Sequence, residues 1–371
     1  MNVLVTGAKG FIGRNLVVSL RRMADILVWE YDLDSPATSL EESLVGADAV
    51  FHLAGVNRPE SVDEYETGNA ELTRRVCHIL RSHRRKPTLV LSSSNQAALD
   101  NPYGISKCHA EKTVLEFGRD MGAAVYAFRL PGVFGKWCRP NYNSVVATFC
   151  HQIARDLQIF VSDPSRELEL VYVDDVVRCF AGILLGQIPE LQDEFYRVRP
   201  TYRITLGALA DTLRGFREGR NHLLLPDMES RLIRFLYATY LSYLPTDSFS
   251  YFLKQHRDPR GELAELLKSP HVGQIFVSRT RPGITRGHHY HDTKVEKFVV
   301  IEGDAVIRFL SVSGGDIIEY PVSGREFRVV DIPPGYSHSI ENVGKTDLIV
   351  LFWANEVFDP EHPDTAAMPV G

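Results

Sequence analysis

The first part of the chain alternates short apolar runs with segments of helical periodicity. The run from Asn2 to Thr6 precedes a glycine-containing stretch and then a helical pattern from Phe11 to Arg22. Uninterrupted apolar runs are typical of strands buried on both faces, and helices between them indicate parallel connections. We therefore predict an α/β domain with a Rossmann-type, doubly wound parallel sheet, whose strands cover 2–6, 26–31, 49–53, 88–91 and 124–129.

Helical spacing dominates the middle of the chain, from about residue 197 to residue 245. The apolar positions that recur near this spacing are Leu232, Ile233, Leu236, Tyr240, Leu241 and Leu244. Such a stripe predicts a helix that packs in the core or between domains, with a dimer face as the alternative.

From about Phe249 onward, short β-like runs replace the helical pattern. They cover 273–278, 296–301, 305–310, 317–321, 325–330 and 348–353, with turns rich in Gly, Pro and Asn between them. Many short strands at regular spacing predict an all-β jelly-roll barrel. We place the boundary in the stretch Pro245 to Ser248, so that residues 1–247 form the α/β domain and residues 248–371 form the barrel.

Composition narrows the functional classes. A chain of 371 residues is longer than a single hydrophobic core usually supports, so two domains are expected. The net charge of −6 argues against a nucleic-acid-binding protein, which needs a positively charged surface. Uncharged stretches such as Phe235 to Thr246 are too short to span a bilayer, and the first residues form a strand pattern where a signal peptide would lie. The odd number of cysteines, five, indicates reduced thiols and a cytoplasmic protein.

A glycine loop between the first strand and the first helix is the strongest local signal. Gly7, Gly10 and Gly13 have the spacing Gly-x-x-Gly-x-x-Gly. Glycines allow a tight turn and close approach of the backbone to a pyrophosphate, which the N-terminus of the following helix attracts. The loop predicts a dinucleotide site.

The residues around this loop bear on the choice between NAD and NADP. Asp32 ends the second predicted strand, where an acid binds a ribose 2′-hydroxyl and favours NAD. Lys9 and Arg14 lie near the loop and could neutralise a 2′-phosphate instead. We favour NADP(H) slightly and keep NAD as the alternative.

This glycine spacing resembles the extended short-chain dehydrogenase/reductase family. The resemblance also covers Leu53, Ala54 and Gly55 after the third strand, and Asn69, for which helix capping is an equal alternative. The cofactor-binding residues that it implies are Gly7, Lys9, Gly10, Phe11, Ile12, Gly13, Arg14, Asp32, Leu53, Ala54, Gly55, Asn69, Tyr103 and Lys107.

A tyrosine and a lysine lie one helical turn apart after a serine-rich strand end. Tyr103 and Lys107 share one helix face, and Ser94 is the last of three serines. An ammonium group beside a phenol lowers the phenol's pKa, so that Tyr103 can exchange a proton with a sugar oxygen. By the family pattern, the catalytic residues are Ser94, Tyr103 and Lys107, with the serine hydroxyl polarising a carbonyl.

Two arginines are candidates for substrate phosphates. Arg166 precedes Tyr172 to Val176, which resembles a late strand-to-helix junction of the extended family, and could pair with a nucleotide diphosphate or form a surface salt bridge. Arg260 begins the second domain and resembles a phosphate-holding arginine of deoxysugar epimerases, with a solvated turn as the alternative. Where many relatives have an asparagine that touches the sugar nucleotide, this chain has Gly132.

A histidine cluster lies within the predicted barrel. Residues two apart on a strand face the same side, so His289 and His291 both point inward, with Glu296 and His338 from neighbouring strands. The spacing from Gly283 to Gly303 matches the first motif of the cupin family, and Pro333 to His338 resembles the second. Three imidazoles and a carboxylate suit Zn, Fe, Mn, Ni or Cu, so we predict one divalent metal, with a metal-free cupin or plain core histidines as the alternative. Zinc is favoured because sugar epimerisation needs no redox step.

The combination of these two domains resembles the CapF-type bifunctional enzymes of capsular polysaccharide synthesis. Segments 100–104, 134–144 and 283–298 carry the resemblance. It implies C3 epimerisation of a UDP-2-acetamido-2,6-dideoxy-4-keto-hexose in the cupin and NADPH-dependent C4 reduction in the first domain, giving UDP-N-acetyl-L-talosamine. It also implies a homodimer. The alternatives are a single-activity nucleotide-sugar reductase or epimerase with a structural, dimerising cupin, a nucleotide-sensing binding module, and a cupin dioxygenase.

Overall fold

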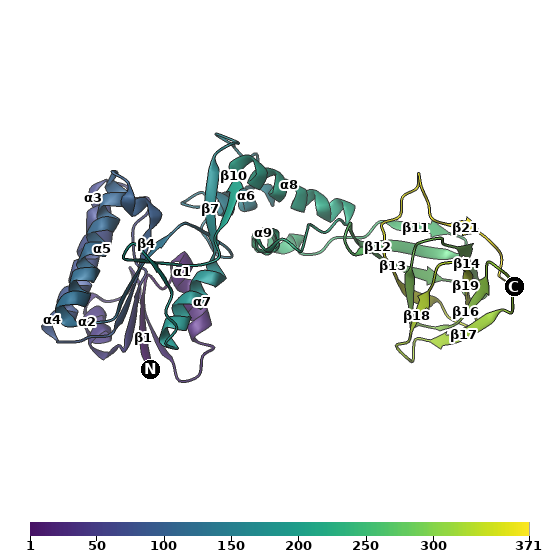
Figure 1. The fold of residues 1–371 in the computed structure, drawn as a ribbon, viewed down its shortest axis with the longest axis horizontal. Helices are drawn as coiled ribbons and strands as arrows, with labels where there is room; N and C mark the ends of the chain where they lie inside the picture. The colour runs from purple at the N-terminus through teal and green to yellow at the C-terminus, as the bar shows by residue number, and fades with distance from the viewer. Residues whose placement is uncertain (371) are drawn as a thin grey trace. The chain divides into compact units, whose positions relative to one another are not determined.

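The computed structural model describes residues 1–370, which fall into two compact units (Figure 1). The first unit contains residues 1–214 and 235–244, and the second contains residues 215–234 and the chain from residue 245 onward. The chain therefore passes between the units three times, after residues 214, 234 and 244.

A seven-stranded sheet forms the centre of the first unit, in the order β2-β1-β3-β4-β5-β9-β8. All neighbours pair in parallel except β8 and β9, which pair antiparallel at the edge. The strands are β1 (Asn2–Thr6), β2 (Leu27–Tyr31), β3 (Ala49–His52), β4 (Thr88–Ser94), β5 (Val125–Leu130), β8 (Glu190–Gln192) and β9 (Phe195–Arg197). The predicted parallel, Rossmann-type sheet is confirmed.

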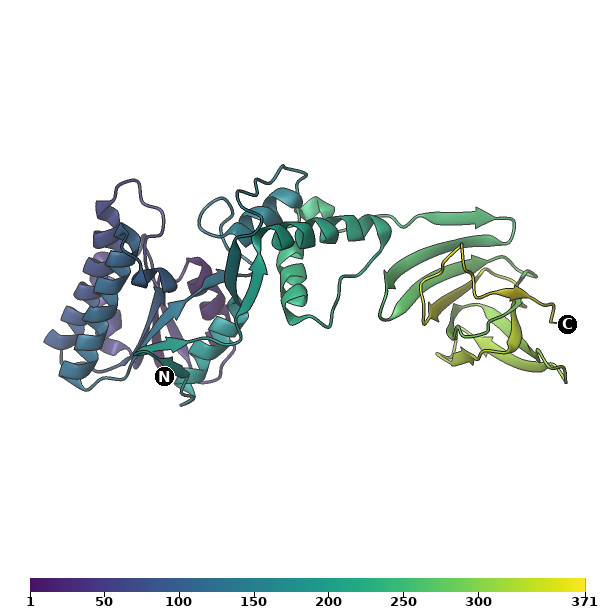
Figure 2. The ribbon, with the colours of Figure 1, turned by 45° about the horizontal axis from the view of Figure 1, so that its top comes forward.

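Helices cover both faces of this sheet (Figure 2) because successive strand residues point to opposite sides. Val3 and Val5 pack with α1 (Phe11–Leu20) and α7 (Val173–Leu184), whereas Leu4 between them packs with the helices of the other face. Those helices are α2 (Ala37–Gly46), α4 (Leu72–Ser82) and α5 (Pro102–Met121).

Smaller elements complete the unit. A three-stranded sheet has the order β10-β7-β6, and its strands are β6 (Gly132–Phe134), β7 (Glu167–Tyr172) and β10 (Tyr202–Thr205). The remaining helical segments are α3 (Asp63–Tyr65), the π-helix η1 (Glu66–Glu71), the 3-10 helix η2 (Asn95–Ala98) and α6 (Val145–Ile153). Two further helices, α8 (Leu206–His222) and α9 (Arg231–Leu241), each contain residues of both units. Leu236 and Tyr240 of α9 are fully buried, and the Phe235 ring stacks on Tyr172 at 4.1 Å, so the apolar stripe of this helix joins the core.

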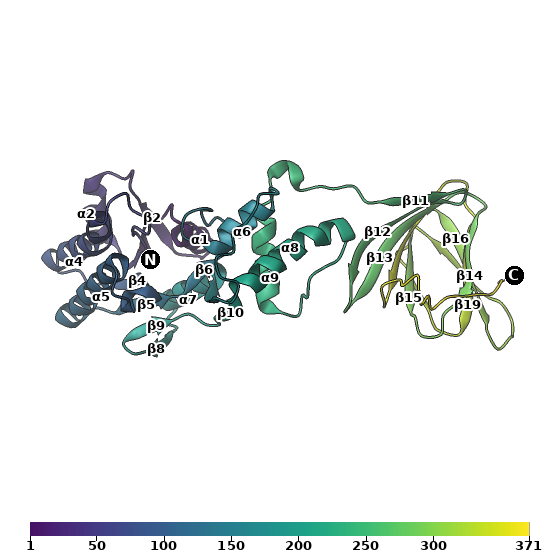
Figure 3. The same cartoon turned by 90° about the horizontal axis from the view of Figure 1, so that it is seen from above.

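The second unit is a barrel of two antiparallel sheets (Figure 3). The first sheet has the order β11-β12-β13-β20-β15-β18, and the second has the order β17-β16-β19-β14-β21. The elements are the 3-10 helix η3 (Thr246–Ser248), β11 (Gln255–Asp258), β12 (Gly261–Ser269), β13 (Gly273–Thr280), β14 (Thr285–Tyr290), β15 (Glu296–Glu302), β16 (Asp304–Ser311), β17 (Ile318–Ser323), β18 (Val329–Ile332), β19 (Tyr336–Asn342), β20 (Leu348–Ala354) and β21 (Ala366–Ala367). The two sheets enclose an apolar core that includes Phe298, Ile307 and Phe352.

Residues 215–234 join the second unit through β12. Lys268 donates its backbone N–H to Leu223 O at 2.7 Å and accepts from Leu225 N at 2.8 Å. No helix within residues 1–370 is long and apolar enough to cross a membrane. All five cysteines are free thiols.

Candidate functional site

The glycine loop lies at the carboxyl end of β1, directly before α1. Gly7 has φ +68°, and a Cβ there would lie 2.6 Å from Ala54 N. A Cβ on Gly13 would lie 2.0 Å from Gly7 O. Both positions thus exclude a side chain, because the loop packs against the segment after β3 and against its own helix. The free N–H groups that begin α1 remain directed at the loop.

The carboxylate of Asp32 is engaged by backbone groups of the same region. It accepts hydrogen bonds from Lys9 N at 2.7 Å and Leu33 N at 2.8 Å. The Lys9 ammonium forms an ion pair with Asp34. Lys9 and the two acids thus lie together at the end of β2, where a dinucleotide's ribose would be recognised.

Ser94, Tyr103 and Lys107 come together at the carboxyl end of β4 and the start of α5. Lys107 is buried, and its Nζ lies 5.9 Å from the centre of the Tyr103 ring. Burial raises the pKa of Tyr103, and the hydrogen bond with Ser94 only partly offsets that rise. The sequence prediction that the tyrosine pKa is lowered is therefore wrong for the protein alone, in which desolvation dominates.

Burial has the opposite effect on the lysine. It lowers the pKa of Lys107 to about 8, while the charge of Glu111 raises it. The ammonium donates to Ser92 O at 3.4 Å. The phenol of Tyr103 is therefore set to remain protonated at neutral pH, whereas Lys107 titrates just above it.

Glu111 supports this arrangement and was missed by the sequence analysis. It lies one turn after Lys107 on α5, is buried, and accepts from Ser93 Oγ at 2.6 Å. Arg129 on β5 donates to both of its carboxylate oxygens. The helical spacing from Tyr103 and Lys107 to Glu111 was a visible signal, but the arginine partner comes from a distant strand.

Asn69 belongs to the π-helix η1 and is buried. Its Oδ1 accepts from Val56 N at 2.9 Å, and its Nδ2 donates to Ser106 Oγ at 3.1 Å. A Cβ on Gly55 would lie 2.7 Å from Asn69 Oδ1 and 2.9 Å from Lys107 Nζ. Asn69 therefore ties the loop after β3 to α5, and Gly55 leaves room for the lysine ammonium.

One large cavity, of about 1160 Å³, connects these groups. It is lined by the glycine loop, Asp32, the segment from Leu53 to Gly55, and all three predicted catalytic residues. Arg166 also lines it. Asn69 is buried outside the lining, and Arg14 instead stacks over the Trp137 ring at 4.5 Å.

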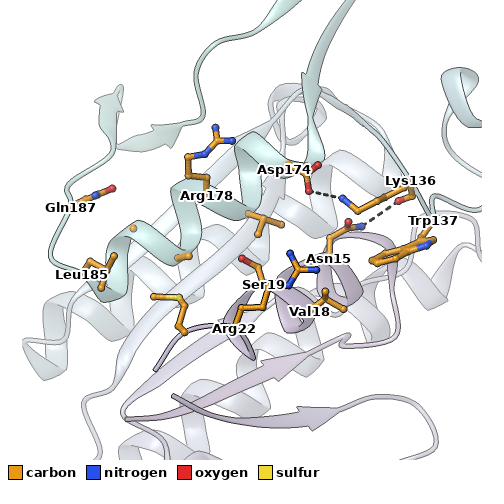
Figure 4. A pocket seen from close by; sticks show the side chains of 14 residues that line it. Asn15, Val18, Ser19, Arg22, Lys136, Trp137, Asp174, Arg178, Leu185 and Gln187 are labelled. Carbon is orange, nitrogen blue, oxygen red and sulfur yellow. Dashed lines mark hydrogen bonds and ion pairs between the residues drawn. The ribbon is translucent and has the colours of Figure 1, made fainter. Parts of the chain in front are cut away.

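A second cavity of about 390 Å³ lies on the other side of Trp137, between α1 and α7 (Figure 4). Lys136 Nζ donates to Asp174 at 2.6 Å, and Asn15 Nδ2 donates to Lys136 O at 3.3 Å. Arg178 pairs with the buried Asp175. The polar groups named here pair with one another, so we assign this cavity no ligand.

His52 and His109 are both plausible acid/base groups by residue type, but the structure gives each of them protein partners. His52 is buried between Thr6 Oγ1 at 2.7 Å and Thr73 Oγ1 at 2.9 Å, and burial lowers its pKa to about 3. His109 Nδ1 lies 3.1 Å from Glu66. Each has protein partners outside the large cavity.

The second unit brings together the four predicted metal ligands. One possible ligand atom from each of His289, His291, Glu296 and His338 lies within 4.8 Å of the others. β14 ends at Tyr290, so His291 is the first residue after this strand. The pairing of β14 with β19 also has a bulge between Gly287 and His289. The assumption that one regular strand carries both histidines is therefore incorrect, although their side chains still meet.

The donor set of this cluster fits a divalent metal. His291 Nε2 and His338 Nε2 lie 3.3 Å and 3.4 Å from Glu296 Oε2. Burial alone would raise the pKa of Glu296, but the two imidazoles beside it lower that pKa to about 2. Within residues 1–370, no hydrogen bond engages the buried ring nitrogens of His338, and the 3.4 Å approach of its Nε2 to Glu296 Oε2 brings together two atoms that could bind the same metal.

Arg260 lies in the turn between β11 and β12. Its guanidinium donates to Asp258 Oδ2 through Nε at 3.0 Å and Nη2 at 2.6 Å. The Arg286 Nη2 atom lies 3.9 Å from the same carboxylate. Asp258 thus lies between two arginines, Arg260 of this turn and Arg286 of β14.

Comparisons with known proteins agree with both units. Residues 3–189 match the NAD dependent epimerase/dehydratase family, and residues 256–366 match the polysaccharide biosynthesis C-terminal domain. The chain is 48% identical over its whole length to UDP-2-acetamido-2,6-beta-L-arabino-hexul-4-ose reductase of Pseudomonas aeruginosa, with 99% of that protein covered.

Solved structures give the same result. The capsular polysaccharide assembling protein CapF of Staphylococcus aureus superposes with a TM-score of 0.93 at 46% identity, covering 100% of both chains. UDP-glucuronic acid 4-epimerase of Bacillus cereus covers 66% of this chain at 17% identity with a TM-score of 0.56, and shares the fold. The chain therefore belongs to the NAD dependent epimerase/dehydratase family and, over its full length, to the CapF-type proteins that join this domain to a polysaccharide biosynthesis C-terminal domain.

Proposed function

We propose that this chain is a bifunctional nucleotide-sugar enzyme of capsular polysaccharide synthesis. In this proposal, residues 248–371 epimerise C3 of a UDP-2-acetamido-2,6-dideoxy-4-keto-hexose. Residues 1–247 then reduce the C4 ketone with NADPH, giving UDP-N-acetyl-L-talosamine. The reductase named above, which is 48% identical along the whole chain, supports the substrate class.

The observation that carries the reduction is the position of Ser94, Tyr103 and Lys107 in the same large cavity as the glycine loop. NADPH, when bound, supplies the hydride. Tyr103 donates its proton to the C4 oxygen, and the Ser94 hydroxyl holds that oxygen by a hydrogen bond. Lys107 orients the cofactor ribose and stabilises the phenolate that forms on Tyr103. Arg166 lines the same cavity, and we propose that its guanidinium contacts the diphosphate of the substrate.

The epimerisation depends on the acidity of the C3 proton beside the ketone. His289, His291, Glu296 and His338 would hold one divalent metal, for which we propose zinc. Such a metal supplies Lewis-acid polarisation of the C4 carbonyl. Among the proton-carrying residues nearby, the Lys294 ammonium donates to Thr365 Oγ1 at 3.4 Å. Tyr290 and Tyr336 are the other candidates for moving the C3 proton.

One assay tests both halves. The protein is incubated with the UDP-4-keto-hexosamine in D₂O, with and without NADPH. Deuterium at C3 without NADPH supports epimerisation, and NADPH oxidation supports reduction. Tyr103→Phe should abolish oxidation and leave exchange intact, whereas His289→Gln should abolish exchange and leave NADPH oxidation intact when the C3-epimerised ketone is supplied. NADPH oxidation without deuterium exchange at C3 would indicate a single-activity reductase. The absence of both activities would refute the proposal that this chain is an enzyme of this class.

Cofactor choice and assembly are tested separately. We propose NADPH over NADH, and the ratio of kcat/KM for the two cofactors measures this preference directly. A ratio below one would assign NADH, in accord with Asp32 at the end of β2. We also propose a homodimer. Light scattering of the protein as it elutes from a size-exclusion column should then give a mass twice that of the 41.8 kDa chain.

A further inference from the structure

The end of the chain lies against the strand that carries the first histidine of the cluster. We define the C-terminal strap as residues 359–370. Its short strand β21 pairs antiparallel with β14, with Ala367 opposite His289 and Ala366 opposite Tyr290 (Figure 1). The strap therefore adds an edge strand to the sheet at the segment that carries His289 and leads to His291.

Asp364 of the strap holds the loop between two ligands. Its carboxylate accepts backbone N–H groups from Asp292 at 2.8 Å, Thr293 at 2.8 Å and Lys294 at 2.7 Å. It also accepts the Thr293 hydroxyl at 2.9 Å. These three residues follow His291 and precede Glu296, so one carboxylate fixes the backbone that spaces the two ligands.

The same residue also orients a ligand through its backbone. His291 Nδ1 lies at hydrogen-bond distance from Asp364 O. A carbonyl oxygen only accepts, so Nδ1 carries the proton and the lone pair is on Nε2. That Nε2 lies 3.3 Å from Glu296 Oε2, inside the cluster. Hydrogen bonds of this kind fix the tautomer and the ring plane of a metal-binding histidine.

The strap also contacts the neighbours of the other two histidines. Met368 O accepts from Ser337 Oγ at 2.5 Å, next to His338 in the chain. Met368 N donates to His288 O at 2.9 Å, and Val370 N donates to His288 Nδ1 at 3.1 Å, next to His289. Each histidine of the cluster is thus either bonded to the strap or adjacent to a residue that is.

We propose that the C-terminal strap is a positioning element for the metal, and that Asp364 is its principal residue. The inference rests on the proposed metal site. With Asp364 in place, the loop from Asp292 to Lys294 is held and the Nε2 atom of His291 is directed at Glu296. Without it, the ligands lose this fixed geometry, and the metal binds more weakly and leaves faster. Loss of a supporting contact of this kind typically costs about 10–100-fold in metal affinity.

The test compares zinc binding by the full chain with that of Asp364→Asn. Asparagine keeps the size of the side chain but replaces one acceptor oxygen with an NH₂ group that faces backbone donors. Zinc affinity is measured by competition with a chromophoric chelator, and release is measured in excess chelator. We expect about 10–100-fold weaker binding and faster release. The absorption bands of bound Co²⁺ should also change, which a general loss of stability would not produce.

Asp359→Asn is the matched control. It is the same substitution in the same strap, but among residues 1–370 Asp359 forms its hydrogen bonds within its own turn, from Glu361 N at 2.9 Å and with the His362 ring at 3.3 Å. Its zinc affinity should equal that of the unaltered protein. Thr293→Val is a milder variant that removes one hydroxyl contact with Asp364 and should weaken zinc binding in the same direction, and it tests the proposal if Asp364→Asn fails to fold.

The outcomes separate this inference from the proposed metal site. An unaltered protein that binds no zinc or Co²⁺ would refute the metal site itself. An unaltered protein that binds zinc, with equal affinity, release rate and Co²⁺ spectrum in a folded Asp364→Asn or Thr293→Val variant, would overturn the role of the strap alone.

Discussion

Arg129 binds Glu111 through two parallel hydrogen bonds, from Nε to Oε1 at 2.9 Å and from Nη2 to Oε2 at 2.7 Å. The Glu111 side chain is 2% exposed and the Arg129 side chain is 20% exposed, so the carboxylate of the pair is almost completely shielded from water. Because Glu111 is on α5 and Arg129 on β5, the pair fixes the helix of the proposed catalytic residues against the sheet.

Glu111→Gln should destabilise the first unit strongly. The substitution leaves the Arg129 guanidinium without its charge partner, and breaking a buried pair costs about 3–5 kcal/mol. Urea unfolding measures this loss. Glu116→Gln, on an exposed position of the same helix, should change the free energy of unfolding by less than about 0.5 kcal/mol. Equal effects of the two substitutions would contradict the assigned role of the pair.

Reduction should decline as pH rises through about 8. Burial lowers the pKa of Lys107 to about 8, so its ammonium is present below that pH and is lost above it. Tyr103 has a raised pKa and stays protonated across this range. The pH profile of kcat/KM for ketone reduction checks this. Lys107→Arg, whose guanidinium stays charged, should lower the rate but remove the fall near pH 8. An unchanged fall in that variant would assign the titration to another group.

Gly13→Ala should weaken cofactor binding. The new Cβ would lie 2.0 Å from Gly7 O, so the loop must move away from the start of α1. We expect at least about a tenfold rise in the NADPH dissociation constant, which corresponds to about 1.4 kcal/mol. Nucleotide fluorescence titration measures it. Gly215→Ala is the control, because its Cβ meets nothing within 4 Å and the residue is in α8. A normal affinity in Gly13→Ala would show that the loop is not a close backbone contact.

Metal removal should lower the thermal stability of the second unit. A ligand that binds only the folded state stabilises it by about 4 kcal/mol when its free concentration is a thousandfold above the dissociation constant. Calorimetry before and after chelation, and after zinc is returned, measures the shift. His338→Gln should abolish the response to zinc, whereas His256→Gln, on the exposed strand β11, should keep it. A full response in His338→Gln would remove that residue from the ligand set.

Local patterns predicted the parts of the structure that depend on short spacing. The glycine loop, the pair Tyr103 and Lys107, and the cluster around His289 each involve backbone geometry that a few neighbouring residues determine. A glycine with φ +68°, or two side chains one turn apart, leaves a direct trace in the sequence. The alternation of apolar runs and helical segments also predicted the parallel sheet of the first unit, and the series of short strands predicted the all-β second unit.

Contacts between distant segments could not be predicted in this way. Nothing near Glu111 indicates its pairing with Arg129, and nothing near His291 indicates its contact with Asp364, 73 residues later. The raised pKa of Tyr103 likewise depends on burial by surrounding elements. The bulge before His289 depends on pairing with β19, which a single strand's pattern does not reveal.

The chain crosses between the two units three times, and this limits how the protein can be divided into fragments. A fragment that begins at residue 248 lacks Leu223 and Leu225, the backbone partners of Lys268 on β12. A fragment that ends at residue 214 lacks Phe235, whose ring stacks on Tyr172. One nick therefore cannot release two complete units, and separating the two proposed activities calls for substitutions within the intact chain.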